Sequence, residues 1–524
     1  MSGVAEVIIG LDVGTTAVKV AAFAVDADAI GAARAPLPSS SREYPLEQPS
    51  PGWQVQDPPT VLAAVDGAIT GCVAQLDGAR VVGLALSTAM HGLIGLDSQR
   101  RPLTPLVTWA DSRGTPEARR LKDMGLARVL LQRTGTPVHP MSPLVKLVWF
   151  ARQEPDLARR VRWWVGLKDY LLHHLTGQLV TELSSASATG LLDLQTRDWD
   201  GYSLGVAEIR HDQLPPVLST TTVLTLTSDV ATAVGLPTGT PVAVGAADGP
   251  LGNLGTGAIE PGIAGLSLGT SGAVRMAVPK PSFDPAGRLF CYALTDDLWV
   301  VGGAISNGGI TLRWAGETFA PDVVADGHAD KEVLALAASV PAGSDGLVML
   351  PYVLSERAPL WDAEIAGAFL GVRHHHTRTH FIRAAVEGVC LQMSTLVDAL
   401  DAVAPVQSIR ATGGPFRSTL WRQVMAATLA RPLTVQADAG GTALGAAALG
   451  WYALGGAPTL ADALVAVGGP RADLVAVPVP VSATDVATYA RLRASVPALI
   501  AAYEQVGAIF AAAPTRSGSS AATD

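Results

Sequence analysis

The first stretch of the chain alternates between apolar runs and a small polar turn. Ile8–Leu11 and Val18–Phe23 are apolar, and Gly14–Thr16 lies between them. Two such runs separated by a short turn that contains glycine predict a β-hairpin. The hairpin carries one acidic side chain, Asp12, just before its turn.

Buried-strand patterns and helical patterns alternate further along the chain. Val81–Ser87 and Pro241–Gly249 are continuous apolar runs, as in strands that are covered on both faces. Apolar residues recur at helical spacing in Lys168–Leu179, Thr379–Leu400 and Ser418–Ala430, and the last of these starts with a serine suited to capping a helix. Strands that alternate with helices indicate an α/β protein.

The opening hairpin has a second copy later in the chain. Gly10–Val20 aligns with Gly265–Met276 when one inserted glycine is allowed. The matched turn and basic residues are Gly14 with Gly269, Thr15 with Thr270, Thr16 with Ser271, and Lys19 with Arg275. The alternative is two unrelated hairpins that share common turn residues. The match of the flanking strands and of the basic residue favours two related domains.

Composition narrows the class of protein. With 524 residues the chain exceeds one ordinary hydrophobic core, so two large domains are expected. A net charge of -9 disfavours a nucleic-acid partner, and no apolar run is long enough to predict a membrane span. Three dispersed cysteines and an N-terminus without a basic leader predict a cytoplasmic protein. We expect the polar tail, residues 513–524, to be disordered.

Two acidic residues stand out as candidates for phosphate chemistry. Small turns such as Gly14–Thr16 let main-chain amides approach an anion, and Asp12, which only the first copy has, is suited to holding Mg²⁺ directly or through water. Asp248 ends an apolar strand, where an open α/β sheet binds ligands, so its carboxylate can act as a general base. By position alone, an Asp that caps the next helix is an equally good interpretation.

A third cluster, in the first half, has the chemistry of a polyol site. His91, Trp109, Asp111 and Arg113 lie within a short span and supply hydrogen-bonding groups beside an apolar plane. Lys146 follows and can meet a carboxylate. The plainer alternative, slightly favoured by these residues alone, is a histidine at the edge of the core and a surface ion pair between Asp111 and Arg113.

Together these motifs resemble the FGGY family of carbohydrate kinases. The resemblance rests on Asp12-Val-Gly-Thr-Thr, the second Gly-Thr-Ser, Asp248, Pro351–Asp362 and the segment Thr-Gly-Gly-Pro-Phe-Arg-Ser that ends at Ser418. It implies two ribonuclease H-like domains of the actin–hexokinase type around a central cleft, with residues 1–250 forming the N-terminal domain and residues 251–512 the C-terminal domain. It also implies phosphorylation of a sugar, polyol or sugar acid by ATP with Mg²⁺.

The resemblance assigns roles by position. Asp248 is the expected general base, and Asp12 the expected metal-binding residue. The expected phosphate-binding residues are Gly14, Thr15, Thr16 and Lys19. The expected nucleotide-binding residues are Gly269, Thr270, Gly309, Arg313, Gly414, Pro415 and Ser418. The expected substrate-binding residues are Met90, His91, Trp109, Asp111, Arg113 and Lys146.

Within the family, the substrate expected is D-gluconate. Thr134–Phe150 and Ser184–Leu194 are most similar to bacterial gluconate kinases, and Lys146 or Arg113 is expected to contact the carboxylate. Xylulose or another pentulose or polyol is the alternative substrate, and a non-catalytic nucleotide-dependent module is the alternative from another class. The expected partner is a small sugar or sugar acid, with no nucleic acid and no membrane. The oligomeric state stays open, a homodimer included.

Overall fold

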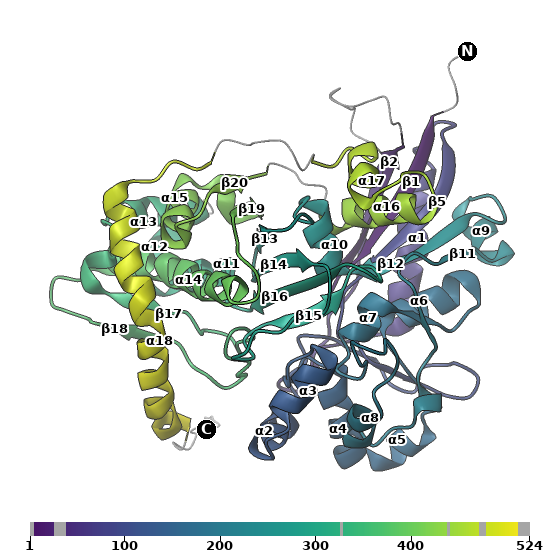
Figure 1. Cartoon of the computed structure of the whole chain (residues 1–524), viewed down its shortest axis with the longest axis horizontal. Coiled ribbons are helices and arrows are strands. Elements are labelled where there is room, and N and C mark those ends of the chain that lie inside the picture. Colours follow the sequence, from purple (N-terminus) through teal and green to yellow (C-terminus); the bar gives the residue numbers. More distant parts are fainter. Residues whose placement is uncertain (1–4, 26–37, 325–328, 437–440, 471–477, 512–524) are drawn as a thin grey trace, which may run out of the picture.

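A computed structural model describes residues 5–25, 38–324, 329–436, 441–470 and 478–511 of the chain. It has two lobes, each built on a six-stranded sheet (Figure 1). The strands of the first sheet are, in spatial order, β11 (Val223–Thr225), β12 (Pro241–Ala247), β5 (Arg80–Thr88), β1 (Glu6–Val13), β2 (Ala17–Ala24) and β3 (Ser39–Glu43). Those of the second are β15 (Phe290–Ala293), β16 (Trp299–Ile305), β14 (Gly272–Val278), β13 (Ile263–Leu268), β19 (Ser408–Thr412) and β20 (Leu433–Val435).

Both predicted hairpins are confirmed. β1 pairs with β2, and β13 pairs with β14, each antiparallel and each joined by the predicted turn. Each hairpin also occupies the corresponding place in its sheet, because β1 pairs in parallel with β5 and β13 pairs in parallel with β19. This shared topology supports two related domains rather than two chance hairpins.

Helices cover both faces of the first sheet. α1 (Pro58–Val73) packs on one face through Val7, Ile9 and Leu11. α16 (Gly441–Ala453) packs on the other through Ile8 and the neighbouring strands. The approach of α16 is close: a Cβ on Gly10 would lie 2.2 Å from the main-chain oxygen of Ala443, so only glycine fits there.

Smaller elements complete the first lobe. Its further helices are α6 (Leu167–Thr176), α9 (Ser228–Val234), α10 (Asp248–Gly255) and α17 (Leu460–Ala466). A helical layer below the sheet contains α2 (Thr115–Asp123), α3 (Ala127–Thr134), α4 (Pro143–Gln153), α5 (Pro155–Arg160), α7 (Leu183–Ser187) and α8 (Gly201–Val206) (Figure 1). Short strand pairs join β4 (Val55–Gln56) to β7 (Leu106–Val107), β6 (Ile94–Leu96) to β8 (Trp163–Val165), and β9 (Thr181–Glu182) to β10 (Val217–Leu218).

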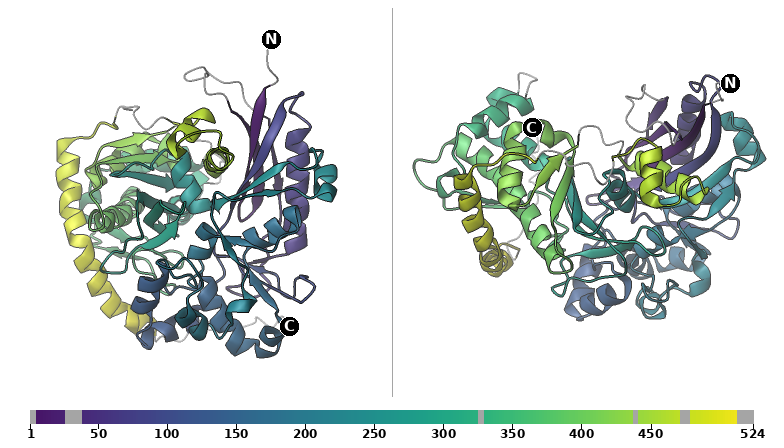
Figure 2. Two further views of the ribbon diagram at one scale, coloured as in Figure 1. Left: turned by 45° about the vertical axis from the view of Figure 1, so that its right-hand side comes forward. Right: turned by 45° about the horizontal axis from the view of Figure 1, so that its top comes forward.

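The second lobe is mostly helical around its sheet. Its helices are α11 (Gly309–Phe319), α12 (Pro321–Val324), α13 (Ala329–Ala338), α14 (Arg378–Asp401), α15 (Thr419–Leu429) and α18 (Ala483–Ala511). α14 is the buried central helix, and α18 runs along the outer edge of the lobe in both views of Figure 2. β17 (Val348–Leu350) pairs with β18 (Ala368–Leu370) beside α14.

The predicted helices and buried strands lie where the apolar patterns put them, with two local differences. The strand predicted over Pro241–Gly249 ends at Ala247, because Asp248 and Gly249 begin α10. Ser418 is the N-cap residue of α15, but its side chain makes no capping hydrogen bond, so its hydroxyl is not used to start the helix. The division of the chain near residue 250 falls inside α10 and stays a prediction. After the second sheet, the chain returns to the first sheet at α16, which packs against β1, β5 and β12 (Figure 1). The first lobe therefore contains a segment from the end of the sequence as well as its beginning. The predicted tail, residues 513–524, lies outside the described residues.

Candidate active site

Asp12 and Asp248 lie at the same edge of the first sheet. β1 and β12 both pair in parallel with the central strand β5, so the carboxyl ends of all three strands point the same way. Asp12 lies near the end of β1, where its Oδ1 accepts a 3.4 Å contact from the hydroxyl of Ser87. Asp248 directly follows β12 and is the first residue of α10, but the N-cap residue is Ala247 and no side chain caps this helix, so the capping interpretation is wrong and the general-base interpretation stays a prediction.

Burial and charge set the proton affinity of Asp248. Burial raises its pKa to about 6, and the negative charge of Asp12 acts in the same direction. The guanidinium of Arg275 opposes this rise, as does the hydrogen bond from the amide of Gly249 to Asp248 Oδ1 (2.8 Å). A carboxylate whose pKa lies near the working pH is suited to general base catalysis. Burial also raises the pKa of Asp12.

Arg275 is a site residue that we did not predict. It lies on β14 of the second lobe, it is close to Asp248, and its Nε is buried without a hydrogen-bond partner among the described residues. Burial lowers its pKa, while Asp248 acts to raise it. The repeat held the available signal, because Arg275 corresponds to Lys19. Lys19 itself is exposed on β2, paired in register with Asp12.

The first turn is connected to the expected sugar site through Trp109. The indole Nε1 of Trp109 donates a 2.8 Å hydrogen bond to Thr15 Oγ1. Tyr44 donates to the main-chain oxygen of Gly14 (2.6 Å), which holds the turn from its other side. Thr16 is exposed. Across the lobes, the guanidinium of Arg357 lies 4.8 Å from the ring centre of Trp109.

His91 presents a defined tautomer. Its Nδ1 lies 2.8 Å from the main-chain oxygen of Ala188, and a carbonyl only accepts, so Nδ1 carries the proton and Nε2 is an acceptor. Burial, the largest cause, lowers its pKa to about 3, so the ring is neutral. Met90 precedes it, and both line one small cavity. A neutral acceptor beside an apolar wall is suited to a sugar hydroxyl.

The expected contact of Arg113 or Lys146 with a substrate carboxylate is not what the geometry favours. The Arg113 side chain is only 4% exposed, pairs with Asp111 through two 2.8 Å hydrogen bonds, and stacks 3.6 Å from the Trp53 ring centre. Lys146 donates to the main-chain oxygens of Met141 and His91, and burial lowers its pKa to about 7. Arg113 is thus committed to supporting the site from behind, while Lys146 uses two of its three ammonium protons on main-chain oxygens beside His91. The Asp111–Arg113 pair that the plainer interpretation expected is present, but it is buried.

The expected nucleotide-binding residues surround one large cavity in the second lobe. Its volume is about 780 Å³. The expected residues that line it are Gly269, Thr270, Gly309, Arg313, Gly414, Pro415 and Ser418. The second hairpin turn closes one side, because the amide of Gly309 donates to the main-chain oxygen of Gly269 (2.7 Å). The Ser418 hydroxyl, which is not used as a helix cap, belongs to this wall.

The donor set fits Mg²⁺. Among the residues that the structure describes, no three His, Cys, Asp or Glu side chains gather as metal ligands. Mg²⁺ is commonly held by one or two carboxylates together with phosphates and water, which needs no such cluster. Asp12 and Asp248 are two mutually repelling, partly buried carboxylates, and a divalent cation between protein and phosphate would relieve that repulsion.

Two related α/β domains with paired acids and a facing nucleotide-sized cavity define a sugar-kinase type of phosphotransferase. The chain belongs to the FGGY family of carbohydrate kinases: residues 7–255 match the N-terminal domain of the family, and residues 264–454 match its C-terminal domain. The kinases of this family use ATP.

Relatives agree with this assignment. The chain is 38% identical to the gluconokinase of Bacillus subtilis (strain 168) over 455 residues, 85% of this chain and 87% of that protein. The gluconate kinase structure from Lactobacillus acidophilus superposes with a TM-score of 0.85 at 33% identity, covering 97% of this chain and 99% of that one. A ligand-bound xylulose kinase from the same organism superposes with a TM-score of 0.86, also at 33% identity and with the same coverage. No helix among the described residues is long and apolar enough to cross a membrane.

Proposed function

We propose that the protein transfers the γ-phosphoryl group of ATP to D-gluconate, producing 6-phospho-D-gluconate and ADP. The transfer chemistry rests on one observation: Asp248, buried with a pKa of about 6, lies at a sheet edge opposite Arg275 of the other lobe. The choice of gluconate rests on the 38% identity to a gluconokinase over most of the chain.

In this proposal the chain's own residues position the reactants and move one proton. Asp248 accepts the proton of the attacking primary hydroxyl as the oxygen bonds to phosphorus. Neutral His91 accepts a hydrogen bond from a sugar hydroxyl through Nε2, and Trp109 supplies an apolar plane beside it. Positioning and neutralisation of charge supply most of the rate in phosphoryl transfer.

ATP would lie in the 780 Å³ cavity, with its phosphates between the two hairpin turns. Asp12 would hold Mg²⁺, directly or through water, and the ion would neutralise phosphate charge. Gly14, Thr15, Gly269 and Thr270 would face the phosphates. Glycine there lets main-chain amides approach an anion closely.

The first experiment is to measure ADP release by the purified protein with ATP and Mg²⁺, offering D-gluconate, D-xylulose, L-ribulose, glycerol or no sugar. Strong stimulation by gluconate alone is the expected result. Asp248→Asn is the matched control, which should bind ATP normally and show at least a thousandfold lower turnover. Near-normal turnover by Asp248→Asn would remove Asp248 from its role.

Xylulose is the second candidate, favoured by the xylulose kinase structure that is as similar to this chain as the gluconate kinase structure is. Stimulation by xylulose alone would keep the transfer chemistry and replace the substrate. Equal, slow turnover with every sugar would instead favour a nucleotide-dependent module on the same fold.

A further inference from the structure

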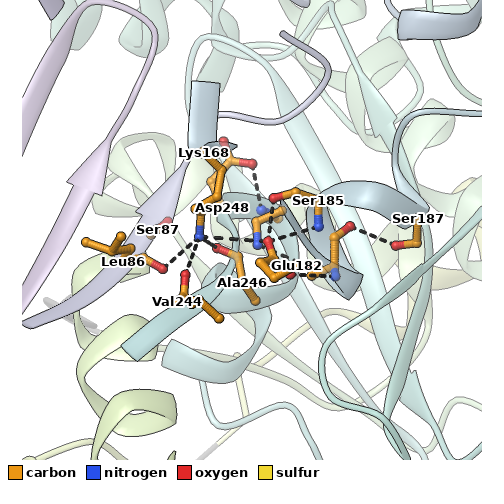
Figure 3. Close-up of polar contacts among 12 residues, drawn as sticks. Leu86, Ser87, Lys168, Glu182, Ser185, Ser187, Val244, Ala246 and Asp248 are labelled. Carbon is orange, nitrogen blue, oxygen red and sulfur yellow. Dashed lines mark hydrogen bonds and ion pairs between the residues drawn. The ribbon is translucent and has the colours of Figure 1, made fainter. Parts of the chain in front are cut away.

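A buried lysine that was not among the expected site residues lies close to Asp248. Lys168, on α6, has only 1% of its side chain exposed. Its Nζ donates hydrogen bonds to the main-chain oxygens of Leu86 (3.0 Å), Val244 (3.0 Å) and Ala246 (2.9 Å) (Figure 3). An ammonium group has three protons, so these acceptors use all of them.

The three acceptors exist because β12 bulges just before Asp248. Ala243 pairs with Ala85, but Ala246 pairs with Ser87, so β12 has one extra residue between two points of contact with β5. The extra residue is accommodated at Gly245, whose backbone has a positive φ of 71°. A Cβ at this position would lie 1.9 Å from the main-chain oxygen of Leu86. A bulge frees carbonyl groups from the ladder, and buried carbonyls need other donors.

Lys168 is also connected to the residue before Asp248 through a carboxylate, Glu182. Glu182 Oε1 lies 3.8 Å from Lys168 Nζ and is fully buried. Glu182 caps α7 by accepting from the amides of Ser184 (2.6 Å) and Ser185 (3.0 Å). Ser184 Oγ in turn accepts from the amide of Ala247 (3.2 Å), the residue immediately before Asp248.

We propose that Lys168, with Glu182, is a positioning residue for phosphoryl transfer: it holds the bulged end of β12 and thereby aims the Asp248 carboxylate at the attacking hydroxyl. This rests on the proposed role of Asp248 as base. Lys168 lines the same small cavity as His91, but its three ammonium protons are taken by main-chain oxygens, so in this arrangement it donates to neither substrate nor nucleotide. We call Lys168 and Glu182 the β12 clamp. Because a misplacement of about 1 Å can lower a rate roughly a hundredfold, we expect the clamp to affect the rate of transfer more than the binding of substrates.

The ammonium also acts on Asp248 through its charge. Burial lowers the pKa of Lys168 to about 8, while the charges of Glu182, Asp169 and Asp248 act to raise it. Removing the positive charge of Lys168 makes the ionised form of Asp248 less favourable, so the pKa of Asp248 rises. The other charged groups around Asp248 and this clamp are Asp12, Arg275, Arg357, Asp169 and Glu182.

The test compares Lys168→Met with Lys146→Met in the full-length protein. Both variants remove a buried lysine that donates to main-chain oxygens, but Lys146 lies under the His91 turn rather than under β12. For Lys168→Met we expect kcat to fall about a hundredfold, KM for ATP to stay within twofold, and the acidic limb of kcat/KM to move to higher pH. For Lys146→Met we expect a higher sugar KM and an unmoved acidic limb.

Two further variants keep the proposal falsifiable if Lys168→Met does not fold. Lys168→Arg, which keeps charge and donors, should recover most of the rate. Glu182→Gln removes a negative charge that partly cancels the positive charge of Lys168. The pKa of Asp248 should then fall, and the acidic limb of kcat/KM should move to lower pH. A folded Lys168→Met with kcat within threefold of the parent, or an acidic limb that stays in place in Lys168→Met and Glu182→Gln, would overturn the proposal. Retained activity of Asp248→Asn would instead overturn the proposed base.

Discussion

At the scale of single residues, the site depends on buried charges that modify one another. Asp248 is held between a carboxylate that disfavours its ionisation, Asp12, and a cation that favours it, Arg275. Burial is the largest cause of the raised pKa. A group in such a balance changes its charge near neutral pH, so both activity and stability should depend on pH there.

The first residue-scale prediction concerns rate. Because the base must be deprotonated to accept a proton, kcat/KM should fall as the pH drops below about 6, the pKa of Asp248. A pH profile of kcat/KM with gluconate measures this directly. An acidic limb near the ordinary value for aspartate, 3.8, would contradict the assignment.

The second residue-scale prediction concerns stability. The pKa of Asp248 is higher in the folded protein, about 6, than its ordinary value of 3.8, so ionisation opposes folding as the pH rises through 6. Asp248→Asn avoids this cost. Its melting temperature relative to the parent should therefore rise from pH 5 to pH 8, by the equivalent of roughly 1.4 kcal/mol, because the rest of the effect builds up between pH 3.8 and pH 5. A difference that does not change with pH in thermal melts would contradict the buried-charge account.

The third residue-scale prediction separates support from substrate contact. Arg113→Gln breaks a buried ion pair and should lower the free energy of unfolding by about 3 kcal/mol or more, with equal effects on gluconate and xylulose turnover. Arg357→Gln removes the cation over Trp109, at the junction of the lobes, and should lower turnover with much less loss of stability. Urea melts and two-substrate kinetics make the comparison. A loss by Arg113→Gln that is specific to gluconate would restore Arg113 as the carboxylate contact.

At the scale of elements, the end of β12 decides where the carboxylate of Asp248, the proposed base, points. A regular strand would pair residue for residue with β5. The extra residue at Gly245 shifts the register before Asp248, and α6 and α7 supply the donors and acceptors that the shifted backbone needs. The site is therefore built as much by the elements that hold β12 as by β12 itself.

The element-scale prediction uses two glycines with left-handed backbone. A Cβ at Gly245 would lie 1.9 Å from a main-chain oxygen, whereas at Gly239, with a φ of 86°, nothing lies within 4 Å. Gly239→Ala should cost about 1 kcal/mol from its backbone conformation alone. Gly245→Ala adds a clash and should cost about 3 kcal/mol or more, and lower kcat in the protein that remains folded. Equal melting temperatures for the two variants would contradict the tight bulge.

At the scale of the whole molecule, the two lobes contribute different parts of one reaction. Asp12 and Asp248 come from the first lobe, and the nucleotide cavity and Arg275 come from the second. α16 returns from the second lobe to the first sheet, and the hydroxyl of Thr442 near its start hydrogen-bonds to Asp12. The chain that returns from the second lobe thus contacts Asp12, the carboxylate that we propose holds Mg²⁺.

The whole-molecule prediction is closure on binding both substrates. Transfer to a sugar rather than to water requires the site to exclude water once ATP and sugar are bound. Small-angle X-ray scattering should show a smaller radius of gyration with gluconate and a non-hydrolysable ATP analogue together than with either alone. Asp248→Asn serves as a control that should close normally. An unchanged radius in the ternary complex would contradict closure.

Much of the fold could be predicted from the sequence because its signals are local. The apolar period along β1, β5, β12 and α14 reports which backbone conformation buries the most apolar surface, and that period is present in any window of the sequence. The repeated Gly-Thr turn also located both hairpins. The sequence thus placed Asp12 before a hairpin turn and Asp248 at the end of a strand, and only the parallel pairing of β1 and β12 with β5 showed that they share one sheet edge.

The partners of the buried charges were decided only by the tertiary structure. Nothing in the spacing of Arg113 or Lys146 shows that the first pairs with Asp111 and the second donates to main-chain oxygens, and nothing local distinguishes Arg275 from the exposed Lys19 to which it corresponds. In the sequence, Lys168 is only one polar position in a helical pattern. The structure shows that α6 places it against the bulge of β12. The sequence by itself determined the elements, because backbone conformation follows local periodicity, and it supplied the two carboxylates that we propose for the reaction. The fold alone decided which cation meets which carboxylate, because those pairs join segments far apart in the chain and their energies depend on burial.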